Sequence, residues 1–307
     1  MDVRLLSREA IEAPKWNGCV HYAANSKIYG YTWYLDNVAE DWVGLVEGDY
    51  QSVFPLVFNR KLIWIKQLYK PLLCQQLGLF SVNVCNQERI RHFVEAIPSE
   101  FKFQEIAFND GNKSVLKLKD ASIQLKDNYR LDLNQSYENI HQNYSTNVKR
   151  NIKKAWKHDF FLNSNLKPEK FVAAVKKAQE EKGVQHPDAL YHAAHRIIYN
   201  CLHRGKGVIM TAEDHTKQLQ SAIFFMFNGM DMVNLMNVST AEGKDKGAMA
   251  FLLDAVIQRE SNKRKFIDFE GSSVEGIARF YKGFGALNVP YYNYTLNKLP
   301  WWLKWTK

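Results

Sequence analysis

The chain has 307 residues and a formal net charge of +9, because 41 lysines and arginines outnumber 32 aspartates and glutamates. Hydrophobic residues make up 46% of it and charged residues 24%, a composition that indicates a globular protein and excludes a disordered one. At this length we expect two domains or one large two-lobed unit.

Composition also excludes several classes of protein. The longest apolar runs, 222–227 and 248–253, are far shorter than the roughly 18 residues that a membrane-spanning helix needs. Residues 1–12 carry several charges and no apolar signal core, so we expect a cytoplasmic protein. The four cysteines form no C-x-x-C pair, and we expect reduced thiols in place of a disulfide framework or a zinc site.

The first half predicts a mixed α/β domain. We expect helices before residue 41, strands at 42–46, 52–58 and 62–65, a helix at 87–96, and strands at 103–108 and 123–133. The stretch 134–147 is polar and rich in turn-forming residues, so we place a boundary there. The predicted domains are 1–140 and 141–307.

The positive charge belongs to the second half. Residues 1–140 hold 16 basic and 17 acidic side chains, whereas residues 141–307 hold 25 and 15. The densest run, 147–157, has five basic residues and no acidic one, which favours a polyanionic partner. A solvated helix face is the alternative.

The second half predicts a regular order of elements. Pro168 opens a helix that ends near Gly183, and Asp188 caps a second one. We then expect strands at 207–212, 219–227 and 232–238, a glycine-bearing loop at 241–247, a helix from 248, a strand at 266–270, a helix at 274–284 and a last strand at 291–296.

This order resembles that of the GNAT acyltransferases. In that family, the loop after the fourth core strand directs the amides of a helix start toward the pyrophosphate of the acyl donor. The family motif has Gln or Arg, two residues, Gly, one residue, and Gly or Ala; this chain has Lys244, Gly247 and Met249 in those places. The methionine makes ordinary acetyl-CoA a poorer fit, because its side chain would crowd the approach to phosphate. The donor-binding residues that the resemblance implies are Gly243, Lys244, Lys246, Gly247 and Ala248, and a plain surface turn is the alternative.

A second resemblance covers most of the chain. The segment D-F-E-G-S at 268–272, followed by F-Y-K-G-F-G-A at 280–286, is similar to the C-terminal signature of the FemABX peptidyltransferases. The basic segment 148–155 resembles the R-x-I-x-K-A pattern of the same family. Residues 42–45, 54–56 and 75–78 resemble the leading domain of its shorter bacterial members.

The resemblance implies an α/β fold of two fused GNAT-like domains, each a mixed, mostly antiparallel sheet flanked by helices. It implies a transferase that moves an amino acid from aminoacyl-tRNA to an amine on a peptidoglycan precursor, with no tightly bound cofactor. Acyl-CoA is the alternative donor, since we find no heptads for the coiled-coil arm that tRNA-binding members often carry. A binding protein that keeps the fold without the chemistry is the third reading.

The resemblance also assigns roles to single residues. Lys282 matches the lysine that meets the donor's phosphates, and Tyr281 would stack on the terminal base or hydrogen-bond the donor. We expect the Lys282 ammonium and the amides after Gly243 to form one anion-binding pocket. A solvated lysine at a helix C-terminus is the alternative for Lys282.

Four further residues are candidates for proton transfer or acceptor binding. Asp268 and Glu270 share one face of a strand end, where either is placed to take a proton from the attacking ammonium; the alternative is a helix cap or a pair with a lysine. Lys149 and Arg150 are candidates to bind the diphosphate of an acceptor, or a tRNA backbone.

Two other patterns carry less weight. His192, His195 and His203 share a helix, but no carboxylate or cysteine completes a zinc spacing, and we predict no metal site. The aromatic and cationic tail at 299–305 is typical of an interfacial anchor, although covering a sheet edge is the favoured reading.

Overall fold

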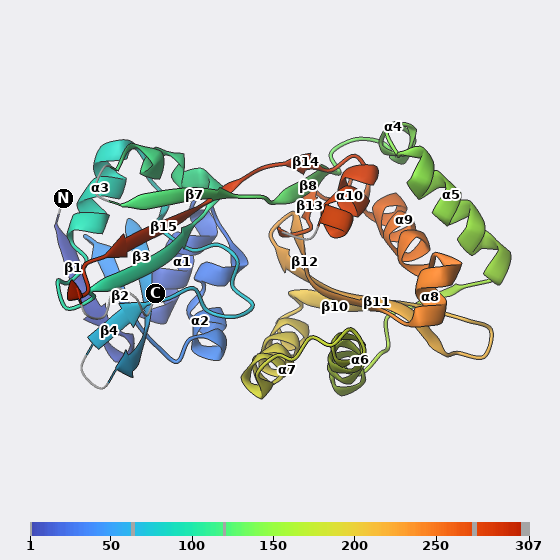
Figure 1. Ribbon diagram of the computed structural model, residues 1–307. Helices are drawn as coiled ribbons and strands as arrows, with labels where there is room; N and C mark the ends of the chain where they lie inside the picture. The colour runs from blue at the N-terminus through green and yellow to red at the C-terminus, as the bar shows by residue number, and fades with distance from the viewer. Residues whose placement is uncertain (1, 63–64, 119–120, 272–274, 302–307) are drawn as a thin grey trace. The chain divides into compact units, whose positions relative to one another are not determined.

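The computed structural model describes residues 2–62, 65–118, 121–271 and 275–301. The chain divides into two compact units. The first unit is Met1–Lys126 with Pro290–Lys307, and the second unit is Asp127–Val289. Each unit holds one sheet and its own helices (Figure 1).

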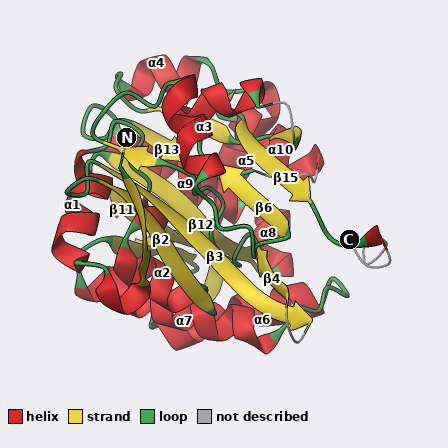
Figure 2. Ribbon diagram, turned by 90° about the vertical axis from the view of Figure 1, so that its left-hand side faces the viewer, coloured by secondary structure: helices red, strands yellow, loops and turns green. Residues whose placement is uncertain are grey.

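The first unit is built on a sheet in the order β1-β2-β3-β4-β6-β15-β7, with β5 paired to β3. Its strands are β1 (Val3–Ser7), β2 (Asp41–Glu47), β3 (Ser52–Leu62), β4 (Ile65–Leu68), β5 (Phe80–Ser81), β6 (Phe103–Phe108), β7 (Ser122–Lys126) and β15 (Tyr291–Asn297). Several of them lie side by side in Figure 2. Its longer helices are α1 (Ala13–Tyr22), α2 (Thr32–Val38) and α3 (Gln87–Glu95), and the 3-10 helix η3 spans Asp110–Lys117.

Helix α3 packs on the sheet of the first unit. The Asn86 side chain caps it by accepting a hydrogen bond from the Arg89 amide at 2.9 Å. Ile90 and Phe93 are fully buried three residues apart, so they share the face that meets the strands. The Phe93 ring lies 6.3 Å from that of Phe54 on β3. This aromatic contact fixes α3 over the sheet.

The second unit has a sheet in the order β14-β8-β13-β12-β11-β10-β9. Its strands are β8 (Tyr129–Asp132), β9 (Phe161–Asn163), β10 (Gly207–Glu213), β11 (Leu219–Asn228), β12 (Asp231–Ser239), β13 (Phe266–Asp268) and β14 (Leu287–Asn288). Its helices are α4 (Tyr137–Gln142), α5 (Thr146–Ala155), α6 (Pro168–Glu180), α7 (Asp188–His203), α8 (Ala241–Lys246), α9 (Ala248–Glu260) and α10 (Glu275–Gly283). Helices α5 and α9 cover one face of the sheet, and α6 and α7 cover the other (Figure 1).

In the second unit, the pairing between β12 and β13 covers only part of β12. Strand β12 runs parallel to β13 only from Asp231 to Val233. A bulge follows, because Phe224 pairs with Met236 while its neighbour Phe225 pairs with Asn234. A bulge re-aims the side chains beyond it and marks where a ladder ends. Among the described residues, the second half of β12 therefore has no strand partner on the β13 side, and the Tyr281 hydroxyl contacts it there.

The structure confirms the α/β class, and it corrects the predicted boundary at residue 140. Residues 123–133, predicted as one strand, form β7 in the first sheet and β8 in the second. The last strand, expected in the second domain, is β15, which pairs with β6 and β7 of the first unit. The local sequence of a strand specifies its alternation of faces but not the sheet it joins, which explains both differences.

Smaller differences concern helix starts and the glycine loop. The segment 241–247 is not a loop, because helix α8 occupies most of it. Asp188 does not cap α7; its carboxylate pairs with Lys176 at 2.8 Å. Parts of several predicted features lie outside the described residues, among them the strand at 62–65, the segment at 268–272, the start of the helix at 274–284 and the aromatic tail. Among the described residues, no helix is long and apolar enough to cross a membrane.

Candidate donor-binding cavity

A cavity of about 340 Å³ lies in the second unit. The start of α9, the second half of β12, helix α10 and the end of α6 supply its walls. Apolar residues such as Val175, Ile277 and Phe280 alternate in its lining with polar Asn151 and Asn237. This mixture of an apolar wall with a few polar groups is typical of small-molecule sites.

Two glycines shape the turn from β12 into α9. The Thr240 hydroxyl caps α8 by accepting from the Gly243 amide at 2.9 Å. A Cβ on Gly243 would come within 2.0 Å of the Gln220 carbonyl oxygen, so no larger residue fits there. Gly247 has a φ of +78° and ends α8 where α9 begins.

The start of α9 faces the cavity. No side chain caps this helix of 13 residues, and Gly247, Met249 and Ala250 line the cavity. Uncapped first-turn amides and the partial positive charge of the helix attract anions. Lys182 and Lys244 add two cationic side chains to the lining. The described residues give neither lysine an ion pair. The cavity therefore suits a negatively charged ligand.

Tyr281 lies at the wall where β12 parts from β13. Its ring stacks on Phe269 at 4.4 Å, and its hydroxyl accepts from the side-chain amides of Asn237 at 3.2 Å and Asn234 at 3.4 Å. Burial is the main cause that raises the pKa of Tyr281 to about 12. At neutral pH the phenol keeps its proton, which it can donate to a ligand in the cavity.

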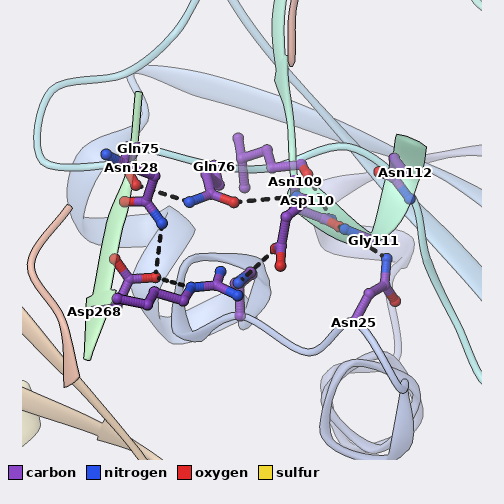
Figure 3. Close-up of polar contacts among 12 residues, drawn as sticks. Asn25, Gln75, Gln76, Asn109, Asp110, Gly111, Asn112, Asn128 and Asp268 are labelled. Atoms are coloured by element: carbon purple, nitrogen blue, oxygen red, sulfur yellow. Dashed lines mark hydrogen bonds and ion pairs between the residues drawn. The ribbon is translucent and has the colours of Figure 1, made fainter. Parts of the chain in front are cut away.

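Asp268 is held in a buried polar cluster instead of lining the cavity. Its carboxylate pairs with Arg130 at 2.9 Å and accepts from Asn128 at 3.2 Å, as Figure 3 shows for the two residues labelled there. It also accepts from the Glu270 amide at 2.9 Å. The ion-pair alternative for Asp268 thus holds, with an arginine as partner. Glu270 has a φ of +58°, a backbone strain that clusters at functional sites, and its charge contributes to the raised pKa of Tyr281.

Comparison with solved structures places this geometry in a known fold. FemX superposes with a TM-score of 0.71 at 13% identity, covering 97% of this chain and 98% of FemX. A tandem GNAT protein from the clavulanic acid biosynthesis pathway gives 0.55 at 10% identity, with 97% and 99% covered. L-PGS from Bacillus licheniformis gives 0.57 at 8% identity, with 94% and 93% covered.

This chain has the tandem GNAT fold. The fold expected from the sequence is thereby confirmed. No family model matches the chain, and no curated protein matches it. At these identities the likeness concerns the fold alone, so the chemistry has to be argued from the residues.

Within the tandem GNAT fold, the predicted donor residues separate into two groups. Gly243, Lys244 and Gly247 line the cavity together with Tyr281. Lys246 does not line it and pairs with Glu242 at 2.5 Å, and Ala248 is fully buried in the core. Part of the segment that the glycine motif marked therefore lines the cavity, and part of it does not.

The expected pocket shared by Lys282 and the α9 start is absent from the described residues. Lys282 is exposed, and its ammonium lies 5.2 Å from the centre of the Tyr129 ring. It does not line the cavity. Phe280 and Tyr281 both line the cavity, and because successive residues of a helix point about 100° apart, the next step along α10 turns Lys282 away from it.

The remaining predicted residues lie away from the cavity. On α5, the Lys149 ammonium donates to the Gln142 carbonyl at 3.1 Å, and Arg150 donates to the Asn147 side chain at 2.7 Å. Neither lines the cavity, whereas their neighbour Asn151 does. On α7, the three histidines join no metal-binding group within the described ranges.

The sequence reading missed Lys182, Asn234 and Asn237. The two asparagines stand three apart in the stretch 232–238 of β12, whose other residues are apolar, and this interruption was a usable signal. Lys182 follows the end of α6, and nothing in its local sequence distinguishes it from the other lysines there.

Proposed function

We propose that this protein transfers an acyl or aminoacyl group from an activated, negatively charged donor to an amine, with the donor bound in the cavity of the second unit. The observation that carries the proposal is the pairing of an anion-binding end with a proton donor in one cavity. The anion-binding end consists of the uncapped start of α9 with Lys182 and Lys244. The proton donor is Tyr281.

The chemistry needs no enzyme nucleophile. The amine nitrogen attacks the donor carbonyl, a C–N bond forms, and negative charge collects on the carbonyl oxygen. When this intermediate collapses, the bond between the carbonyl carbon and the donor's leaving atom breaks. The Tyr281 hydroxyl, already oriented by two asparagine amides, hydrogen-bonds this oxygen or gives its proton to the departing atom. Glu270 takes the proton that the attacking amine releases. We assign the base to Glu270 because its charge acts on the Tyr281 hydroxyl at the cavity wall.

An ester donor suits this arrangement better than a thioester. A thiol ordinarily has a pKa near 8.5, so the thiolate of a thioester donor leaves without help from a proton donor. The alkoxide of an ester donor is a far stronger base, so its departure needs a proton donor such as Tyr281. Burial keeps Tyr281 protonated well above neutral pH. Aminoacyl-tRNA is such an ester, and it is the donor that the FemABX resemblance implies.

The basic run on α5 supports a polyanionic substrate. Lys153, Lys154 and Lys157 are exposed, and none has an ion pair among the residues that the structure describes. We assign Lys149 and Arg150 to the diphosphate of the acceptor, with the tRNA backbone as the other partner of this run. A cell-wall precursor as acceptor rests on the family resemblance.

Titration calorimetry tests the donor. CoA, an acyl-CoA and an aminoacylated acceptor-stem RNA are titrated separately into the wild type and into Lys182→Ala and Lys244→Ala. We expect the RNA to bind, and each variant to weaken it about three- to tenfold with a shallower salt dependence. Lys177→Ala is the matched control, because Lys177 is exposed on α6 and does not line the cavity.

The outcomes separate the candidate donors. Binding of CoA without binding of the RNA overturns the ester donor and leaves an acyl-CoA-dependent transferase. If no donor binds, or if Lys177→Ala weakens binding as much as the cavity variants do, the cavity is not the donor site. Transfer to a model amine then decides between an enzyme and a binding protein of the same fold.

A further inference from the structure

Asn237 lies in the donor cavity beside the hydroxyl of Tyr281. It belongs to the second half of β12, lines the cavity and is exposed. Its Nδ2 donates to the Tyr281 hydroxyl at 3.2 Å and to Asn234 Oδ1 at 3.4 Å. A side-chain amide nitrogen has two hydrogens, so these two bonds use its whole capacity as a donor.

The oxygen of the same carboxamide is not used within the protein. Among the described residues, no group donates a hydrogen bond to Asn237 Oδ1. Both partners of the nitrogen are buried, Asn234 at 3% and Tyr281 at 6% exposure. Because the nitrogen is turned toward these buried partners, the solvent-exposed part of the carboxamide is its oxygen. The cavity therefore presents a hydrogen-bond acceptor next to the proton donor Tyr281.

The spacing of these two groups matches an α-amino acyl group. The nitrogen and oxygen of one carboxamide are about 2.2 Å apart. Since Nδ2 lies 3.2 Å from the Tyr281 hydroxyl oxygen, Asn237 Oδ1 lies within about 5.5 Å of that oxygen. In an α-amino acyl group, the α-nitrogen is about 3 Å from the carbonyl oxygen. A carbonyl oxygen that binds the Tyr281 hydroxyl thus brings the α-nitrogen within reach of Asn237 Oδ1.

The charges around the cavity make such an acceptor necessary for an ammonium group. The described lining contains Lys182 and Lys244 and no carboxylate. An ammonium placed there without an acceptor loses hydration and is repelled by both lysines. A neutral amide oxygen accepts from the ammonium and adds no negative charge that would compete with the donor's phosphate for the lysines.

We infer that Asn237 is a specificity-determining residue, which selects aminoacyl over plain acyl donors by accepting a hydrogen bond from the donor's α-ammonium. This inference rests on the proposed function and narrows the class of group that is transferred. The carbonyl oxygen of the donor meets the Tyr281 hydroxyl, and its α-ammonium meets Asn237 Oδ1.

Two stable ligands test the selection. They are acceptor-stem RNAs whose 3′ ends carry an alanyl or a propionyl amide, and they differ only by the α-ammonium. In calorimetry, the wild type should bind the alanyl RNA about tenfold more tightly, because a hydrogen bond to a charged group is a strong one. If nothing accepts from the ammonium, the two lysines make the alanyl RNA the weaker ligand, so the sign of the preference is itself a readout.

Two variants assign the preference to a residue. Asn237→Leu removes the oxygen at nearly constant size, and on it the alanyl RNA should have no advantage. Gln179→Leu is the matched control, because Gln179 lines the cavity from α6 and makes no hydrogen bond to Tyr281. It should leave the ratio of the two dissociation constants unchanged. Melting temperatures without ligand report whether each variant is folded.

The outcomes separate this inference from the proposed function. If the wild type binds both RNAs equally, or the propionyl RNA more tightly, the selection by Asn237 is wrong while the donor site stands. A preference for the alanyl RNA that persists in folded Asn237→Leu, or that disappears in Gln179→Leu, also overturns it, because another group then holds the ammonium. If neither RNA binds, the proposed donor fails and the inference fails with it. The comparison on the wild type needs no substitution, so it stands even if Asn237→Leu does not fold.

Discussion

Replacing Tyr281 by phenylalanine removes one hydroxyl from the donor cavity and keeps the ring. The stack on Phe269 and the apolar contacts survive, so the change isolates the proton donor. In the proposed reaction this hydroxyl stabilises the developing charge. Loss of one such donor ordinarily slows the chemical step by about 10²–10³, or about 3–4 kcal/mol of barrier.

The same change has a smaller cost in stability. Asn237 and Asn234 lose an acceptor held at 3.2 and 3.4 Å, long bonds to one neutral oxygen. Together they contribute roughly 1–2 kcal/mol to the free energy of unfolding. In a domain of this size, each kcal/mol lowers the melting temperature by about 2–4 °C. The variant therefore stays folded at 25 °C, and its loss of rate is not a loss of folded protein.

The assay is single-turnover transfer from an aminoacylated acceptor-stem RNA to an amine, with thermal unfolding of the same samples. Single-turnover conditions report the chemical step without product release. A rate within threefold of the wild type, in a folded variant, would refute the role of Tyr281. A transfer rate that falls together with the melting temperature would mean that the role of Tyr281 is structural only.

Three further predictions concern stability. Because the native pKa of Tyr281 is about 12 against an ordinary 10, the folded protein keeps between pH 10 and 12 a proton that the unfolded chain loses. The free energy of unfolding should therefore fall as pH rises through this window, by about 1.4 kcal/mol per pH unit for this group, and Tyr281→Phe should fall less steeply in urea titrations. Gly243→Ala should lower the free energy of unfolding by more than about 2 kcal/mol, because the new Cβ would meet a backbone oxygen at 2.0 Å. The control is Gly18→Ala in α1, where the Cβ enters open space, and thermal melts should show it to be neutral or stabilising. Asp268→Asn should cost about 3–5 kcal/mol by removing the negative charge from the buried ion pair with Arg130, and chemical denaturation that shows under 1 kcal/mol would contradict the importance of this ion pair.

Local sequence predicted the parts of the second unit that depend on local physics. The helices of α6, α7 and α9 follow apolar periodicity and their end signals, and the glycine segment before α9 lies at the cavity as expected. The family signature led to Tyr281, which lines the cavity, and to Lys282, which does not. One residue along a helix rotates the side chain by about 100°, and a motif alone does not say which neighbour faces the ligand.

What the sequence could not supply depends on distant pairing. Asp268 was read as a base because its partner Arg130 stands 138 positions earlier in the chain. Strand β15 was assigned to the wrong domain because the alternation of apolar and polar residues along a strand does not specify which strand it pairs with. Each case is a contact between segments that local patterns treat separately.

The central claim is that the cavity of the second unit holds the donor's reactive carbonyl against Tyr281. A crystal structure with an acceptor-stem RNA that carries a stable 3′-amide in place of the aminoacyl ester tests it most directly. The account predicts the amide oxygen within hydrogen-bonding distance of the Tyr281 hydroxyl, with phosphate near the amides that open α9. RNA bound with its 3′ end outside this cavity would contradict the account.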